Sequence, residues 1–150
     1  MHLGVILLLT GVTGSQALKL ESGPAVLSEG ETLALGGYML TLQGLDVTRD
    51  TNRVKLQAAF LLEQEGRPRD TLAPIRERLP NRKEAWSRVA VRSTLVSDVY
   101  VSLLDVSEEE RRVLIAAQVY PLVSWLWLGG VLMALGALPA LLGSDRRAQA

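Results

Sequence analysis

Hydrophobic residues are unevenly distributed along this chain, because two long uncharged runs enclose a middle region that carries nearly all the charge. Met1–Leu18 contains no Lys, Arg, Asp or Glu, and neither does Val113–Ser144. A helix needs about 20 consecutive apolar residues to cross the hydrocarbon core of a bilayer. The pattern predicts transmembrane helices at residues 1–18 and 120–143. Residues 19–119 then form a separate domain, and residues 144–150 form a short tail.

The second apolar run carries signals for its orientation. Tyr120, Trp125 and Trp127 gather near its start, where aromatic rings favour the headgroup layer, and Arg146 and Arg147 follow its end. Positively charged residues beside a membrane helix usually remain in the cytoplasm. This places the tail in the cytoplasm and the middle domain on the outer side of the membrane.

Small residues in the second run recur at four-residue spacing, in the pairs Gly130 with Ala134 and Gly136 with Ala140. Such spacing lets a neighbouring helix approach closely. The alternative is that these residues reflect only the ordinary composition of membrane helices.

The first apolar run has two interpretations. It is at the short end of what spans a bilayer. It also resembles a signal peptide, because Ser15 and Ala17 supply small residues at the right spacing for cleavage, although no Lys or Arg precedes it. Hydropathy alone leaves both interpretations open.

The middle region reads as a small antiparallel β domain. Val54, Leu56, Ala58 and Phe60 alternate with polar or smaller residues, which is typical of a half-buried strand. Leu40 and Leu42 are further core candidates. We expect about six strands and no long soluble helix, so the fold class is mainly β, an antiparallel barrel or sandwich flanked by the two helices.

Turn formers divide this region into strands. Gly36–Gly37, Gly44 and the pair Gly66 with Pro68 are predicted turns, and the acidic stretch at residues 107–110 is a predicted bend between the last two strands.

Composition excludes several functions. Sixteen basic residues balance sixteen acidic ones, so net charge gives no reason to propose a nucleic acid partner. The chain has no cysteine and one histidine, His2, and no recognisable catalytic motif. A classical hydrolase is therefore close to excluded, and we assign no catalytic residue.

Residues 67–92 hold eight basic residues against three acidic ones. This segment could attract an anionic group to one side of the domain. The alternative is a solvated hairpin that is partly neutralised within the fold. The candidate residues of this docking or anion-binding surface are Arg76, Arg78, Arg82, Arg88 and Arg92.

Several stretches together resemble the C-terminal part of the CcmF family, the haem lyase membrane subunits of cytochrome c-type biogenesis. They are "HLGVILLLTGVTGS", "SEGETLALGGYMLTLQGLD", "LAPIRERLPNR", "VRSTLVSDVYVSL" and "YPLVSWLWLGGVLMALGALPALLGSDRR". The resemblance covers nearly the whole chain but only about the last quarter of the family, and it favours a retained first helix.

The resemblance implies a cofactor and partners. Family members hold a b-type haem between membrane helices through two histidines, and His2 matches one of them, so haem b is the expected cofactor and His2 an axial ligand of its iron. The second ligand must come from another chain or segment. The implied partners are the N-terminal CcmF-type membrane part, other Ccm haem-delivery and apocytochrome-handling proteins, and apocytochrome c. The implied location is the bacterial inner membrane, with the β domain in the periplasm.

Departures from the family limit what this chain does alone. The tryptophan-rich segment that handles the reacting haem is absent, and Arg88 stands where many relatives carry an acidic residue. We expect a split subunit or a fragment of a haem lyase that is not catalytic by itself. The alternative function is a non-catalytic membrane-anchored β module that binds a protein partner and has a cleaved signal peptide.

Overall fold

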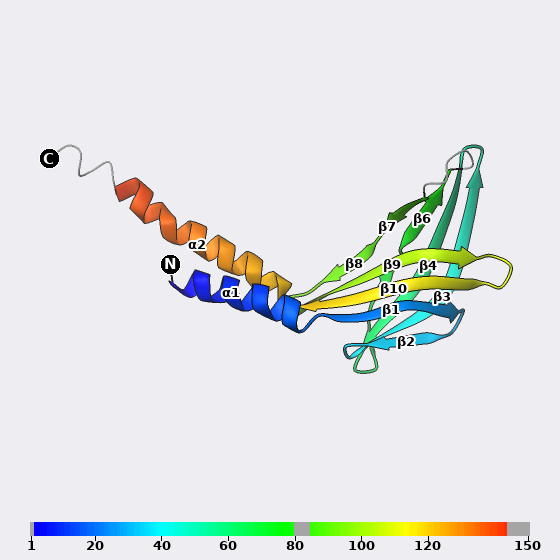
Figure 1. The fold of residues 1–150 in the computed structure, drawn as a ribbon, viewed down its shortest axis with the longest axis horizontal. Helices are drawn as coiled ribbons and strands as arrows, with labels where there is room; N and C mark the ends of the chain where they lie inside the picture. The colour runs from blue at the N-terminus through cyan, green and yellow to red at the C-terminus, as the bar shows by residue number, and fades with distance from the viewer. Residues whose placement is uncertain (1, 80–84, 144–150) are drawn as a thin grey trace. The chain divides into compact units, whose positions relative to one another are not determined.

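The structure is a computed structural model that describes residues 2–79 and 85–143, with side chains up to residue 138. The chain divides into two compact units. The helical unit comprises residues 1–19, 93–98 and 120–150, and the β unit comprises residues 20–92 and 99–119. Residues 93–98, which the sequence analysis assigned to the middle domain, cluster with the helices because they hydrogen-bond to the start of the second helix. Figure 1 shows the order of the elements.

The β unit is a sandwich of two antiparallel sheets. The four-stranded sheet has the order β1-β10-β9-β8. Its strands are β1 (Leu20–Ser28), β10 (Arg112–Pro121), β9 (Ser97–Ser107) and β8 (Ala90–Ser93). The six-stranded sheet has the order β2-β3-β4-β6-β7, with β5 also paired to β4. Its strands are β2 (Thr32–Leu35), β3 (Tyr38–Asp50), β4 (Arg53–Gln64), β5 (Arg67–Leu72), β6 (Ile75–Arg78) and β7 (Ala85–Arg88).

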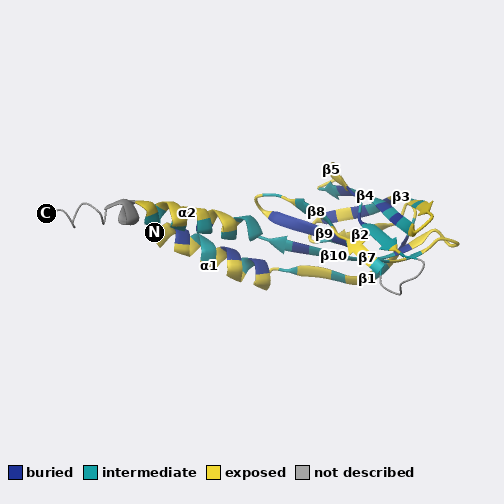
Figure 2. Ribbon diagram, turned by 90° about the horizontal axis from the view of Figure 1, so that it is seen from above, coloured by how far each residue is buried: buried dark blue, intermediate teal, exposed yellow. Residues whose placement is uncertain are grey.

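Alternation along the strands builds the core. In β4, Leu56, Ala58, Phe60 and Leu62 are buried while the residues between them are only partly buried, as the period of two requires. Val54 packs against this core and is partly buried. The core also contains Leu40 and Leu42 from β3, Val99, Val101 and Leu103 from β9, and Val113, Ile115 and Ala117 from β10, together with Leu27, Tyr38, Leu72 and Val119. The dark blue bands in Figure 2 follow this pattern. The predicted mainly β fold is confirmed, with ten strands among the described residues rather than about six.

Two of the predicted turns are two-residue hairpins. Gly36 and Gly37 have φ of 61° and 80°, and they join β2 to β3. Glu65 and Gly66, with φ of 54° and 69°, join β4 to β5 in the same way. Positive φ at both central positions gives the backbone twist that suits a hairpin, which is why glycine is favoured there.

The predicted turn at Gly44 is wrong. β3 runs through this position, and its pairing with β4 shifts register between Leu42 and Gly44. A β-bulge places one extra residue in a strand and is a frequent use of glycine within a sheet. Pro68 likewise lies inside a strand, β5, rather than in the turn.

The helical unit contains α1 (His2–Ala17) and α2 (Val123–Gly143), which pack against each other. A Cβ added at Gly129 would lie 2.5 Å from the backbone nitrogen of Leu8, and one at Gly11 would lie 2.6 Å from that of Leu126. A Cβ at Gly4 would lie 2.7 Å from Met133 Cγ and 2.9 Å from the backbone nitrogen of Met133. The two helices therefore meet backbone to backbone, which only glycine allows.

α1 lies within the first uncharged run of the sequence, and α2 lies within the second, which also contains most of β10. Within residues 2–79 and 85–143, no helix has both the length and the apolar character that a bilayer crossing requires. The predicted tail, with Arg146 and Arg147, lies outside the described residues.

Candidate functional site

The basic segment contributes a two-stranded ribbon, β6 and β7, to one end of the six-stranded sheet. In antiparallel pairs, residues directly opposite each other point to the same face. The pairs Ile75 with Arg88 and Glu77 with Trp86 therefore share one face, and Arg76 and Ser87 share the other. The two faces of this ribbon make different contacts.

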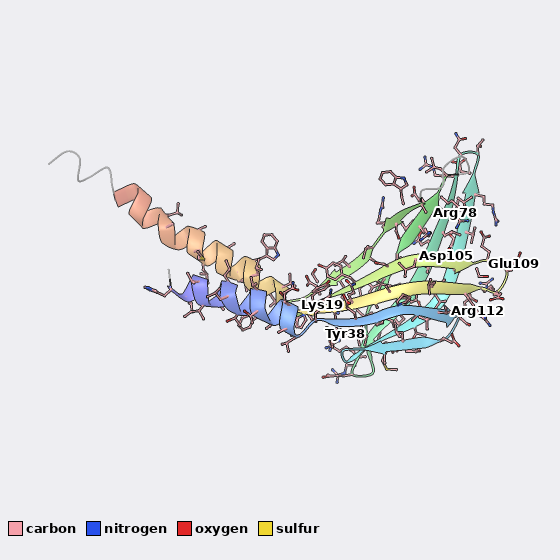
Figure 3. All side chains as sticks on the ribbon, viewed as in Figure 1. Lys19, Tyr38, Arg78, Asp105, Glu109 and Arg112 are labelled. Atoms are coloured by element: carbon pink, nitrogen blue, oxygen red, sulfur yellow. The ribbon has the colours of Figure 1, made fainter. Side chains whose placement is uncertain are left out.

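The inner face of the ribbon contacts β9 of the opposite sheet. The Arg76 guanidinium donates a hydrogen bond to the carbonyl of Leu104. Ser87 Oγ donates to the carbonyl of Leu103, with 3.0 Å between the two oxygens. Arg78 Nη2 lies 3.7 Å from Asp105 Oδ1, and Figure 3 labels both residues. These contacts join the two sheets at this edge of the sandwich.

The outer face of the ribbon forms a shallow cavity of about 290 Å³. Four of its lining residues belong to this face, namely Ile75, Glu77, Trp86 and Arg88, and Ser87 also borders it although its hydroxyl bonds on the inner face. Trp86 is 67% exposed, so a large aromatic side chain lies open to solvent beside this cavity. This cavity brings together an aromatic ring and a cation on one strand, two residues apart.

The five candidate basic residues have different surroundings. Arg76 and Arg78 face the opposite sheet, and Arg92 Nε on β8 lies 3.4 Å from Asp70 Oδ2 on β5. Arg88 lines the outer cavity and has no ion-pair partner in the part of the chain that the structure describes. Arg82 lies outside the described residues. Within the described residues, part of the positive charge is neutralised inside the fold, and Arg88 is available to a partner.

Sequence reasoning missed two features of this surface. It did not single out Trp86, although an aromatic residue inside a basic segment was a usable signal. It also grouped the arginines together, because their division between two faces depends on the pairing of β6 with β7.

His2 is the first residue of α1, and its side chain is exposed. Among the described residues, no cluster of His, Cys, Asp or Glu could hold a metal ion. The chain has one histidine in total. An exposed imidazole at a helix end suits one axial bond to a haem iron, but a bis-histidine site needs a second ligand from outside this chain.

The β-sandwich is the part of the chain that matches a known protein family. A family model described as the CcmF C-terminal beta-sandwich matches residues 21–121, which is more than half of the chain. The chain belongs to this family, which takes part in cytochrome c-type biogenesis.

Individual relatives agree with this assignment. The chain is 27% identical over 148 residues to the cytochrome c-type biogenesis protein CcmF of Haemophilus influenzae, covering 97% of this chain and 22% of that protein. It is 30% identical over 125 residues to the cytochrome c-type biogenesis protein CycK of Bradyrhizobium diazoefficiens, covering 82% of this chain and 18% of that protein.

A solved structure, the cytochrome c haem lyase CcmF, superposes with a TM-score of 0.69 at 27% identity, over 91% of this chain and 23% of that one. The chain thus spans about a fifth of the length of the relatives that it matches.

Proposed function

We propose that this chain serves as the C-terminal portion or a split subunit of a CcmF-type haem lyase that acts in cytochrome c maturation. The observation that carries the proposal is the family match over residues 21–121, together with the superposition on a haem lyase structure. On this proposal the chain supplies a periplasmic docking domain and one haem-ligand histidine. The remainder of the lyase holds the reacting haem.

His2 is the proposed axial ligand of a haem b that is shared with the rest of the lyase. His2 is exposed at the first residue of α1, which leaves the imidazole accessible to a group held by neighbouring helices. When bound, the haem would form part of the membrane core of the assembly. His2 would hold and orient it from one side.

The test is co-expression of the chain with the N-terminal remainder of a CcmF-type lyase. His2→Ala should reduce the b-type haem that co-purifies and weaken cytochrome c maturation. Gln16→Ala, near the other end of α1, is the matched control and should retain both. An unchanged haem absorbance spectrum in His2→Ala would overturn the ligand assignment.

We further propose that α1 and α2 attach the chain to the bacterial inner membrane, with the β domain in the periplasm. Large apolar side chains are exposed on both helices, including Leu3, Ile6, Trp127, Val131 and Leu135. Lys19 follows α1 and lies 4.9 Å from the ring centre of Tyr120, which precedes α2. A cation on an aromatic ring is well suited to the headgroup layer. Retention in the membrane pellet at alkaline pH would support this attachment, and release would contradict it.

The alternative of a cleaved signal peptide is less well supported. Cleavage after Ala17 would remove α1, including Gly4 and Gly11, which pack closely against α2. Loss of this helix would expose the contact surface of α2 around Gly129. The mass of the purified protein separates the two proposals, because cleavage would remove residues 1–17 and with them His2.

A further inference from the structure

β7 is the last strand of the six-stranded sheet. Among the described residues, β6 is the neighbour of β7 within its sheet, and no strand pairs with its other side. The chain continues after Arg88 into β8, which belongs to the opposite sheet. An edge strand of this kind presents backbone N–H and C=O groups that can pair with another strand.

The side chains beside this edge are those of a binding surface rather than of a protected edge. Trp86, Ser87 and Arg88 are all exposed, and Trp86 and Arg88 lie on the outer face with the cavity between β6 and β7. Native edges are often protected by covering or by charge alone, whereas this one combines a charge with an exposed indole.

The positive charge of Arg88 favours a partner that carries an acidic residue. Arg78 and Arg92 have carboxylate partners within the fold, whereas Arg88 has none among the described residues. An incoming carboxylate at Arg88 would form a charge-assisted hydrogen bond. Glu77 lies opposite Trp86 on the same face and disfavours a second acidic residue there.

We propose that β7 is a docking edge for an extended segment of a partner protein, which adds a strand to the sheet. An acidic residue of the partner pairs with Arg88, and an apolar residue two positions away packs on Trp86. The spacing of two follows from the strand repeat, because alternate side chains point to one face. Main-chain hydrogen bonds provide affinity in this mode and the two side chains provide specificity. The inference rests on the docking role proposed above for the basic segment.

A synthetic peptide tests the proposal with the full 150-residue chain in detergent. The probe is a fluorescein-labelled ten-residue peptide of alternating Val and Thr that carries Glu and Leu two positions apart. Fluorescence anisotropy should report binding. Trp86→Ala and Arg88→Glu should each weaken binding about ten-fold, a typical loss for an interface anchor. Arg67→Glu, the same charge change on β5, is the matched control and should retain binding.

Two modified peptides test the mechanism. Replacing the peptide Glu with Lys should weaken binding to the native chain about ten-fold and restore it to Arg88→Glu. Methylating alternate backbone nitrogens on the peptide edge that faces β7 should abolish binding, because a strand without those donors cannot pair. Equal binding of the methylated peptide, or equal binding to Arg88→Glu, would overturn the proposal.

Self-association of the chain and cytochrome c maturation in cells provide two further tests of the docking edge. If the chain self-associates and Trp86→Ala disperses it, the edge pairs with a second copy and the partner proposal is wrong. Cytochrome c maturation in cells that express Arg88→Glu separates this inference from the haem lyase function. If Arg88→Glu loses peptide binding but cytochrome c maturation stays normal, the docking edge is supported and its role in maturation is excluded.

Discussion

Ser124 on α2 donates a hydrogen bond from its Oγ to the main-chain carbonyl of Thr94, with 2.6 Å between the two oxygens. The turn that contains Thr94 therefore contacts the first residues of α2. A second bond, from the backbone nitrogen of Leu122 to the carbonyl of Val96 at 2.8 Å, reinforces this contact. Leu122 has φ of 61°, a conformation that non-glycine residues rarely adopt, and this bond helps to hold it.

Thr94→Val should destabilise the helical unit by about 1–3 kcal/mol, the cost of leaving polar groups unpaired. The Thr94 hydroxyl donates to the carbonyl of Ser97 at 2.7 Å and accepts from the backbone nitrogen of Ser97 at 3.0 Å. Valine has the same shape but cannot make either bond. Thermal unfolding followed by circular dichroism checks this. Thr48→Val, on an exposed part of β3, is the control, and an equal effect in both variants would contradict the role of the turn.

Gly129→Ala should disrupt the packing of α1 on α2, whereas Gly130→Ala should not. A Cβ at Gly129 would lie 2.5 Å from the Leu8 nitrogen, and one at Gly130 would meet nothing within 4 Å. Forcing an atom into a packed site costs about 1–3 kcal/mol, while alanine in place of glycine gains up to about 1 kcal/mol in an open helical position. Unfolding midpoints of the two variants in detergent should move in opposite directions. A similar shift in both would contradict the packing.

Ser87→Ala should lower stability by about 1 kcal/mol, because it removes the hydrogen bond from β7 to the Leu103 carbonyl. Urea unfolding measures the change. Ser107→Ala at the exposed end of β9 is a control with the same chemical deletion. Equal stability of Ser87→Ala and the native chain would show that this bond does not join the sheets.

The ion pair of Glu29 with Arg111 should make stability depend on pH. The pKa of Glu29 is held below its ordinary value, chiefly by the hydrogen bond from the Arg111 guanidinium, against an opposing effect of desolvation. A carboxyl with a lowered pKa stabilises the fold at pH values above its unfolded pKa, about 4.3. This contribution is lost as the pH falls through the folded pKa.

The comparison of native chain and Glu29→Gln tests this dependence. Glu29→Gln should unfold at a lower temperature at pH 7, and the difference should disappear towards pH 3. Glu109→Gln, in the turn between β9 and β10, is the control. A constant difference between pH 7 and pH 3 would show that ionisation of Glu29 does not contribute.

The sandwich could be predicted from sequence because its signals are local. Alternation in β4 and the Gly36–Gly37 pair depend only on neighbouring residues, and both are confirmed. The role of Gly44 could not be predicted, because a glycine in a turn and one in a bulge look alike until the partner strand is known. The four-residue spacing selected Gly130 as a close-packing residue, but Gly129 is the one that packs on α1, because only the position of α1 separates the packed residue from the open one.

The candidate site was only partly predictable for the same reason. The positive charge of residues 67–92 was evident, but its division between two faces follows from the register of β6 with β7. The role of His2 as a haem ligand stays a prediction that the co-expression experiment decides.

One residue, Val89, separates the last strand of one sheet from the last strand of the other. β7 ends at Arg88 and β8 begins at Ala90, while Val89 itself is exposed. A single proteolytic cut at this corner would free the ends of both layers at once. Such a cut would open the sandwich beside the strand on which the proposed partner docks, and a bound partner would shield that corner from proteases.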